Sequence, residues 1–449
     1  MTSIKIGSYN FRIISNPQRS QAMTATTAHA DPACTGSACL DGVDLPAVAR
    51  RVGTPCHVYS ASAIRARIDA LQTALHGVDA LVCYAAKANS NVAILRLMAD
   101  AGLGADIVSG GELWRCLYAG IPADRIVFSG VGKTADEIAD ALEAGVARFN
   151  VESADELQLL QRVASEFNVT ACASARINPD VDALTHAKIS TGKSENKFGV
   201  GIDEAREWFA GGAASTHVRL DGLHVHIGSQ MLSLDPIRAA LQRVADFWRE
   251  LASTGHMIRS IDVGGGLGVC YRAGQDHPVS INDYAGVIRE ALAGFEGRIL
   301  LEPGRWLVAE AGVLLTRVIR VKHGRERKFL ILDAAMNDLL RPSLYDAWHD
   351  IVPLVDDARS MQTYDVVGPV CETGDTFARD RELPECRAGD LVMIKATGAY
   401  GASMASTYNS RPLAAEVLFD RGRYAVVRER QVFEEMITGE QFADQWETP

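Results

Sequence analysis

The sequence contains no run of about 18 apolar residues, which is the length that a membrane-spanning helix needs. It also lacks a basic excess, because 45 Lys and Arg stand against 56 Asp and Glu, for a formal net charge of −11. An acidic balance argues against a nucleic-acid-binding surface. The first residues carry charges but no apolar stretch of the secretory kind. We therefore expect a cytoplasmic protein with no nucleic-acid or membrane partner.

Cysteine pairs at metal-binding spacing are also missing. The nine cysteines are scattered along the chain, and the closely spaced Cys34 and Cys39 lie in a polar segment near the N-terminus. An odd and dispersed set of cysteines is typical of reduced thiols. We therefore expect free thiols and no metal ion.

Short apolar runs alternate with helical patterns over residues 62–307. Eight such runs cover 81–84, 104–108, 125–128, 148–151, 171–177, 220–227, 260–263 and 298–301. Strands and helices that alternate over this length predict a parallel (β/α)8 barrel, which is an α/β fold. An open, doubly wound sheet shows the same alternation and remains the alternative.

The remaining segments have a different pattern. Valine-rich runs separated by Gly, Pro and Asp turns follow the barrel, and they cover 313–321, 328–332, 363–367, 391–394 and 423–427. They predict an all-β domain, sandwich-like or barrel-like, over 308–449. Residues 46–61, with a short helix and a strand at 57–59, are expected to join this domain. Residues 1–45 have no clear period and predict a poorly ordered extension.

Unusual polar residues stand at the ends of the expected barrel strands. In such barrels the carboxyl ends of the strands meet at one face, and that face carries the chemistry. The residues are Lys87, Asp106, Arg176, His224, His226, Ser229, Glu302 and Arg305, with the glycines of 264–266. Each alone is weak evidence, since a histidine in a strand is usually a core residue, but their coincidence at one face indicates a site.

Lys87 ends the first apolar run and has two interpretations. Lysine is rarely buried, so Lys87 can be a solvated charge at a strand end. It can instead be a buried amine that forms a covalent imine with a carbonyl compound. The sequence around Lys87 does not decide between the two.

The triple glycine Gly264-Gly265-Gly266 lets backbone N–H groups approach an anion closely. A tight turn would also explain it. Together with Ser229, Gly304 and Arg305, it predicts a phosphate cradle, which is common at the last strands of this fold.

Two other patterns suggest different chemistry. Gly130-Val-Gly-Lys-Thr134 is similar to a nucleotide P-loop, but the position where that motif needs another glycine is Val127. His224 and His226 could suggest a metal site. We expect one of them to face the barrel interior and the other the helices, so that they do not share a metal ion. Neither pattern is therefore taken as a functional motif.

A lysine, a phosphate cradle, an imidazole and a carboxylate together suit pyridoxal 5'-phosphate. The amine holds the aldehyde, the glycines and the arginine hold the phosphate, and the imidazole stacks on the ring. A carboxylate at the pyridine nitrogen keeps that nitrogen protonated and makes the ring an electron sink. Glu302 is the candidate for this carboxylate.

Long motifs carry a resemblance to a known family. They are Tyr84-Ala-Ala-Lys-Ala-Asn89, Ser109-Gly-Gly-Glu112, Thr191-Gly-Lys-Ser-Glu-Asn-Lys-Phe-Gly199, His224-Val-His-Ile-Gly-Ser-Gln230, Gly264-Gly-Gly-Leu-Gly268, Glu302-Pro-Gly-Arg305, Arg341-Pro-Ser-Leu-Tyr345, Cys371-Glu-Thr-Gly-Asp375, Gly398-Ala-Tyr400 and Tyr408-Asn-Ser-Arg-Pro412. From about residue 46 to the C-terminus, the chain resembles the fold-type III pyridoxal-phosphate decarboxylases, and among them the branch that acts on diaminopimelate. Residues 1–45 do not match.

The resemblance implies roles for matched positions. Lys87 carries the cofactor, His226 stacks on its ring and Glu302 pairs with the pyridine nitrogen. Further contacts to the cofactor are expected from Asp106, Arg176, Ser229, Gly265, Gly266, Gly268, Gly304, Arg305 and Tyr400. Contacts to the substrate are implied for Arg305, Arg341, Tyr345, Glu372 and Tyr400. Cys371 is implied to be the acid that reprotonates the α-carbon.

The resemblance also implies an assembly and a reaction. Members of the family are dimers with active sites at the subunit interface, so that Cys371 and Glu372 of the partner subunit would complete each site. The reaction would convert meso-2,6-diaminopimelate to L-lysine and carbon dioxide, the last step of lysine biosynthesis. The alternatives are a paralogue for ornithine, arginine or carboxynorspermidine, a racemase, and a non-catalytic regulator. From the residues alone, Arg341-Pro342 can also be a surface turn and Cys371 a buried apolar cysteine.

Overall fold

The computed structural model describes residues 3–6, 9–12, 39–182, 197–211, 216–355, 358–443 and 446. The chain forms two compact units, Met1–His29 with Ala61–Ala311, and Ala30–Ser60 with Gly312–Pro449. Most of the expected N-terminal extension lies outside the described residues. Within it, β1 (Ser3–Ile6) and β2 (Tyr9–Arg12) pair as antiparallel strands.

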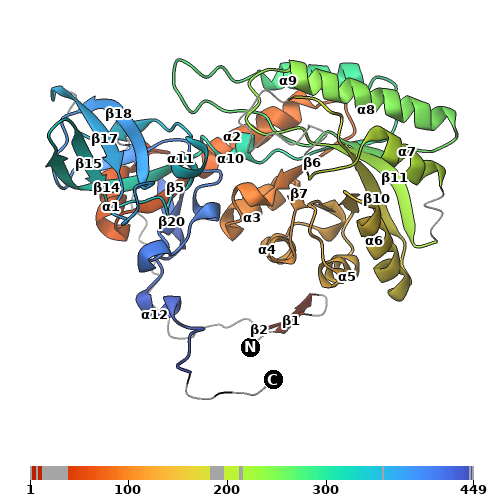
Figure 1. Ribbon diagram of the computed structural model, residues 1–449, viewed down its shortest axis with the longest axis horizontal. Helices are drawn as coiled ribbons and strands as arrows, with labels where there is room; N and C mark the ends of the chain where they lie inside the picture. The colour runs from red at the N-terminus through yellow and green to blue at the C-terminus, as the bar shows by residue number, and fades with distance from the viewer. Residues whose placement is uncertain are drawn as a thin grey trace. The chain divides into compact units, whose positions relative to one another are not determined.

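The first unit contains the predicted barrel of eight parallel strands (Figure 1). Its strands are β6 (Ala80–Ala85), β7 (Gly104–Ile107), β8 (Ile126–Phe128), β9 (Arg148–Val151), β10 (Ala171–Ile177), β11 (Val218–Val225), β12 (Ser260–Asp262) and β13 (Arg298–Leu301). The last strand, β13, pairs in parallel with the first, β6, and closes the ring. This closure excludes the open, doubly wound sheet.

Helices alternate with the barrel strands, as expected, and one helix precedes the first strand. They are α2 (Ala61–Ala74), α3 (Val92–Asp100), α4 (Gly110–Ala119), α5 (Ala135–Ala144), α6 (Ala154–Glu166), α7 (Ile202–Ala210), α8 (Asp235–Ser253), α9 (Ile281–Ala291) and α10 (Arg305–Val308). The helices after β7, β8 and β9 begin at a hydroxyl cap, where Ser109, Thr134 and Ser153 each accept a backbone N–H of the first turn. Short capped connections of this kind keep the carboxyl ends of β7, β8 and β9 at one face of the barrel.

The second unit is built on a nine-stranded sheet. Its strands are β5 (Cys56–Ser60), β14 (Gly312–His323), β15 (Lys328–Leu332), β16 (Ile351–Pro353), β17 (Met361–Val367), β18 (Thr376–Pro384), β19 (Leu391–Ile394), β20 (Ala415–Asp420) and β21 (Arg423–Arg428). The five predicted strands are present, and β16, β18 and β20 were not predicted. Four consecutive charged residues at 379–382 conceal the period of β18.

The segment that precedes the barrel belongs to this second unit. β5 is fully buried, antiparallel to β14 and parallel to β20. The remaining elements are β3 (Cys39–Leu40), β4 (Val43–Asp44), α1 (Leu45–Val52), α11 (Arg341–Tyr345) and α12 (Phe433–Met436). Leu45, Val48 and Ala49 of α1 are buried and contribute to the same apolar cluster as β5.

Two expectations from composition can be compared with the described residues. None of the helices in the described ranges has both the length and the apolar character that crossing a membrane requires. Cys39 is disulfide-bonded, so the expectation of free thiols throughout is wrong. No disulfide is formed by Cys56, Cys83, Cys116, Cys172, Cys270, Cys371 or Cys386.

Candidate active site

Lys87 lies directly after β6, in a short 3-10 turn over Ala86–Ala88. Its Nζ atom donates a hydrogen bond to Oδ2 of Asp106, on β7, at 3.0 Å. The Asp106 side chain is fully buried, whereas 40% of the Lys87 side chain is exposed. The amine is therefore anchored on a buried carboxylate and is still accessible to a small molecule. This arrangement excludes a freely solvated charge.

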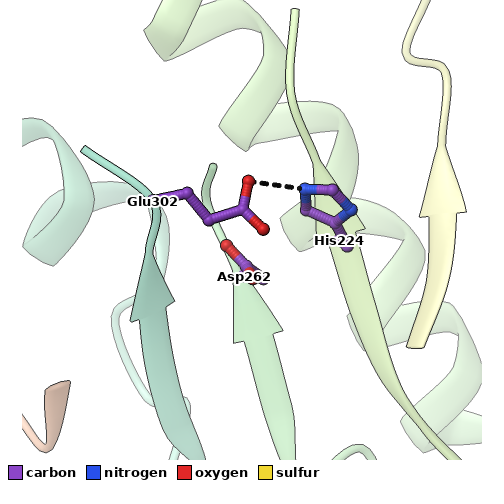
Figure 2. A group of neighbouring side chains, drawn as sticks. All are labelled: His224, Asp262 and Glu302. Carbon is purple, nitrogen blue, oxygen red and sulfur yellow. Dashed lines mark ion pairs between the residues drawn. The ribbon is translucent and has the colours of Figure 1, made fainter. Parts of the chain in front are cut away.

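Glu302 lies at the end of β13 and is buried among polar side chains. Its Oε1 atom accepts hydrogen bonds from Ser129 Oγ and Asn150 Nδ2, both at 3.2 Å. Its Oε2 atom lies 3.3 Å from Nε2 of His224. Figure 2 shows the Glu302 and His224 side chains directed toward one another, with Asp262 beside them. Residues from four barrel strands thus meet at one carboxylate.

The pKa values of the acidic groups in this cluster shift in opposite directions. Burial raises the pKa of Asp106 and of Asp262, and the negative charge of Glu302 raises both further. Burial also acts to raise the pKa of Glu302, but the positive charges of His224 and Lys87 outweigh it and the pKa falls below its usual range. For His224, burial acts to lower the pKa, and the charges of Glu302 and Asp262 reverse the shift. Glu302 is therefore ionised, and it lies beside a histidine whose pKa is raised.

His224, on β11, and His226, one residue after its end, correct one expectation. Side chains two residues apart on a strand share a face, so the placement of His224 and His226 on opposite sides is wrong. His224 contacts Glu302, and His226 accepts the N–H of Gly265 at Nδ1, at 3.2 Å. Burial, followed by the charges of Arg176 and Lys87, lowers the pKa of His226 to about 3. His226 is therefore a neutral imidazole at the same end of the barrel.

Donor atoms of His224, Asp262 and Glu302 all lie within 4.8 Å of one another, a spacing that a metal ion could use. In this structure Glu302 is paired with His224, and the N–H of Gly264 donates to Asp262 at 2.9 Å. The absence of a metal site stays a prediction.

The triple glycine forms a loop that only glycine can build. A Cβ atom on Gly265 would lie 2.2 Å from the carbonyl oxygen of Glu302. A Cβ atom on Gly266, which has a φ of +104°, would lie 2.3 Å from the carbonyl oxygen of Gly228. The loop thus packs its backbone against the ends of β13 and β11. This leaves backbone rather than side chains at the place predicted for a phosphate.

Arg305 begins α10, next to Gly304, and is buried. Its Nη2 atom donates to Ser229 Oγ at 3.0 Å, and its Nη1 atom donates to the hydroxyl of Tyr271 at 2.5 Å. Gly268 takes part in the same region through its N–H, which donates to the carbonyl of Met231 at 2.9 Å. The structure therefore brings Ser229, Gly304 and Arg305 together, as predicted from the strand ends.

Two other basic residues are held by carboxylates. Arg176 pairs with Glu152 at 2.7 Å, and both side chains are buried. Lys133 pairs with Glu156 at 2.6 Å and donates to the carbonyl of Gly130 at 2.7 Å. Its amine is thus fully engaged inside the unit, which agrees with the rejection of a nucleotide P-loop.

The second unit carries the other predicted residues. Arg341 and Tyr345 are the first and last residues of α11, and Arg341 is 6% exposed, so it is not a surface turn. Cys371 and Glu372 lie in the exposed connection between β17 and β18, so Cys371 is not a buried cysteine. The N–H of Cys371 donates to Oδ1 of Asn409 at 3.0 Å.

Tyr400 lies in the connection after β19 and has a φ of +57°. A left-handed backbone conformation is uncommon for a residue with a bulky side chain. It therefore marks a constrained position within the second unit, which fits the expectation of a functional residue.

Comparisons with known proteins agree with this geometry. The family described as "Pyridoxal-dependent decarboxylase, pyridoxal binding domain" matches residues 61–309. The diaminopimelate decarboxylase of Zymomonas mobilis is 47% identical over 409 residues, which are 90% of this chain and 97% of that protein. The diaminopimelate decarboxylase of Pseudomonas aeruginosa is 49% identical over 405 residues, again 90% of this chain and 97% of that protein. The chain belongs to the diaminopimelate decarboxylase family.

A solved structure supports the same assignment. The crystal structure of diaminopimelate decarboxylase from Helicobacter pylori complexed with L-lysine aligns with a TM-score of 0.85 and 44% identity. The alignment covers 88% of this chain and 98% of that chain. The predicted family, the barrel fold and the β-rich C-terminal region are therefore confirmed.

Membership of the diaminopimelate decarboxylase family also confirms pyridoxal 5'-phosphate as the cofactor. The residues at the barrel end fit this group. Lys87 offers an accessible amine, Glu302 a buried and ionised carboxylate, and His226 a neutral imidazole. The glycine loop offers a backbone surface for a phosphate.

Sequence reasoning missed several polar residues of this site. They are Ser129, Asn150, Glu152, Asp262 and Tyr271. Asn150 and Asp262 lie within predicted strands, and Ser129 and Glu152 directly follow predicted strands. The strand-end rule that found Lys87 therefore contained a signal for four of the five. Tyr271 lies in a loop and has no such signal.

Proposed function

We propose that this chain converts meso-2,6-diaminopimelate to L-lysine and carbon dioxide. The observation that carries the proposal is the accessible amine of Lys87, anchored on buried Asp106 at the barrel end that also holds the ionised Glu302. Relatives that share nearly half of the residues are named for this activity. The proposed site residues are those named from the sequence.

The cofactor, when bound, withdraws electrons from the α-carbon of an amino acid, so that a carboxylate can leave as carbon dioxide. Lys87 would hold the cofactor through its aldehyde carbon. Glu302, kept ionised by His224, would keep the pyridine nitrogen protonated. His226 offers a neutral and flat surface to the ring. Phosphate contacts are proposed for Ser229, Gly266, Gly304 and Tyr400.

A proton must replace the departing carboxylate at the α-carbon. We assign this proton to the thiol of Cys371, which is exposed and held at its backbone N–H by Asn409. In the proposed homodimer, the group that serves each site is Cys371 of the partner subunit. Glu372 of the partner subunit would bind the distal ammonium of the substrate.

The shared site makes a quantitative prediction. Lys87→Ala and Cys371→Ala chains are each expected to be inactive, and mixing them should restore about a quarter of wild-type activity. Random pairing places half of the chains in mixed dimers, and each mixed dimer has one intact site of two. Activity is measured after subunit exchange, which labelled chains verify separately. Exchange without any recovery would contradict shared sites.

Substrate choice is proposed to depend on the distal carboxylate. Diaminopimelate carries an amine and a carboxylate at its distal end, whereas lysine and ornithine carry only an amine there. The planar guanidinium groups of Arg305 and Arg341 suit a carboxylate, and the hydroxyl of Tyr345 could add a hydrogen bond. Substrates without the carboxylate leave a buried guanidinium unpaired, which favours diaminopimelate.

Arg341→Ala should lower kcat/KM for meso-diaminopimelate by about a thousandfold, the scale of discrimination when a buried charged group loses its partner. Cofactor content should stay unchanged, and the ratio of kcat/KM for diaminopimelate to kcat/KM for lysine should fall. The measurement is kcat/KM for both substrates in both proteins. Arg325→Ala, at an exposed turn of the same unit, is the control and should behave as wild type. If Arg341→Ala lowered kcat/KM equally for diaminopimelate and lysine, Arg341 would not be the residue that binds the distal carboxylate.

We also propose that the enzyme acts in the cytoplasm on a small molecule, without a nucleic-acid or membrane partner. Seven described cysteines form no disulfide, as is usual in a reducing compartment. The net charge of −11 does not favour binding to a polyanion.

A further inference from the structure

His349 is a buried histidine whose two ring nitrogens both lie at hydrogen-bond distance from polar groups. It follows α11 in the second unit and is 1% exposed. Its Nε2 atom lies 2.7 Å from Nη1 of Arg341, and its Nδ1 atom lies 2.8 Å from the carbonyl oxygen of Lys395. The ring therefore bridges α11 and the end of β19.

The partners of His349 fix its protonation. A guanidinium group has donors and no acceptor, so Nε2 must accept the N–H of Arg341 with its lone pair. A carbonyl oxygen only accepts, so Nδ1 must carry the proton. His349 is thus a neutral imidazole in the Nδ1–H tautomer. A doubly protonated ring would direct an N–H at the N–H of a cation.

The segment around His349 is held from several sides. Nη1 of Arg381, on β18, donates to the carbonyl of His349 at 3.1 Å, and its guanidinium lies 3.5 Å from the centre of the Trp348 ring. The indole N–H of Trp348 donates to Asp350 at 2.8 Å. Contacts on both sides of His349 leave its ring little freedom to turn away from Arg341.

Lys395, whose carbonyl oxygen accepts from the ring of His349, begins a loop with a constrained backbone. Lys395 precedes Ala396, which has a φ of +56°, and the N–H of Thr397 donates to the carbonyl of Gly312 at 2.9 Å. Tyr400, also at positive φ, ends this stretch. One imidazole therefore connects the helix that carries Arg341 to the backbone that carries Tyr400.

We propose that His349 is a positioning residue that fixes the guanidinium of Arg341 and thereby sets the affinity for the distal carboxylate of the substrate. The inference rests on the proposed function, in which Arg341 binds that carboxylate. A guanidinium whose plane is already fixed offers its fork of donors without losing rotamer freedom on binding. Removing the acceptor at Nε2 should therefore weaken substrate binding more than the chemical step.

Two amide variants separate the two hydrogen bonds. In His349→Gln, the longer side chain can place its carbonyl oxygen near the former Nε2 and accept from Arg341. In His349→Asn, the shorter side chain can reach the Lys395 carbonyl but not Arg341. His349→Asn should raise KM for meso-diaminopimelate by about 10- to 100-fold with kcat within about threefold, and His349→Gln should retain both values within about threefold. His323→Gln, at the exposed end of β14, is the control.

Readouts other than turnover separate positioning from a general loss of structure. Bound cofactor and the thermal unfolding midpoint should be the same in the Asn and Gln variants. In wild type, 15N NMR of the histidine rings should show one neutral imidazole protonated at Nδ1, with signals that are absent from His349→Gln. A ring protonated at Nε2, or equal KM values for the two variants, would overturn the proposal. Failure of wild type to form lysine would refute the proposed function instead, and the NMR result would still decide the tautomer.

Discussion

Lys87→Ala should abolish the covalent attachment of pyridoxal 5'-phosphate and lower kcat by about 10³- to 10⁴-fold. Lys87 is the amine that holds the cofactor in the proposed reaction, and without it the cofactor has no covalent attachment in the site. Its hydrogen bond to buried Asp106 explains why one lysine is selected. The measurement is borohydride reduction of the enzyme, followed by mass analysis of the intact chain and its peptides.

The control for this experiment is Lys322→Ala, an exposed lysine of β14 in the other unit. It should retain the reducible link and normal turnover. If reduction still attaches the cofactor to the Lys87→Ala chain, the amine has been assigned to the wrong residue.

Glu302→Gln should lower kcat by about a hundredfold or more, equivalent to about 3 kcal/mol of electrostatic stabilisation. The amide keeps the size of the side chain but cannot hold the pyridine proton by charge. It also removes the carboxylate that lies beside the buried His224, and breaking a buried pair is costly to stability. The unfolding midpoint and the bound cofactor must therefore be measured along with kcat.

The same cluster offers a matched control. Burial and the charge of Glu302 raise the pKa of Asp262, whereas the pKa of Glu302 is lowered. Asp262→Asn keeps the shape of the side chain and removes a carboxyl group from the same cluster, and kcat should stay within about tenfold of wild type. Near-normal turnover in Glu302→Gln, or equal losses in both variants, would contradict the role of Glu302.

The barrel and its site were predictable from the sequence because one rule of geometry covers both. Strands that alternate with helices place their carboxyl ends at one face. Lys87, Asp106, Ser229 and Glu302 all stood at such ends in the sequence, and all lie at that face in the structure. In the folded barrel, residues that are far apart in the sequence therefore lie close together.

Other features of the structure could not be predicted from the positions of strand ends. β18 carries a run of charged residues that hides its period, and Tyr271 reaches Arg305 from a loop that has no regular period. The misplacement of His224 and His226 came from an error about strand geometry rather than from a missing signal. His349 was not singled out because only tertiary contacts bring its ring to Arg341 and Lys395.

The most direct test of the proposed activity is to incubate the purified, cofactor-loaded protein with meso-2,6-diaminopimelate and to identify the products by mass. We expect L-lysine and carbon dioxide in equal amounts, and a preference of about a thousandfold in kcat/KM over lysine, ornithine and arginine. Decarboxylation of ornithine, arginine or lysine as efficiently as diaminopimelate, or no lysine formed from diaminopimelate, would contradict the account.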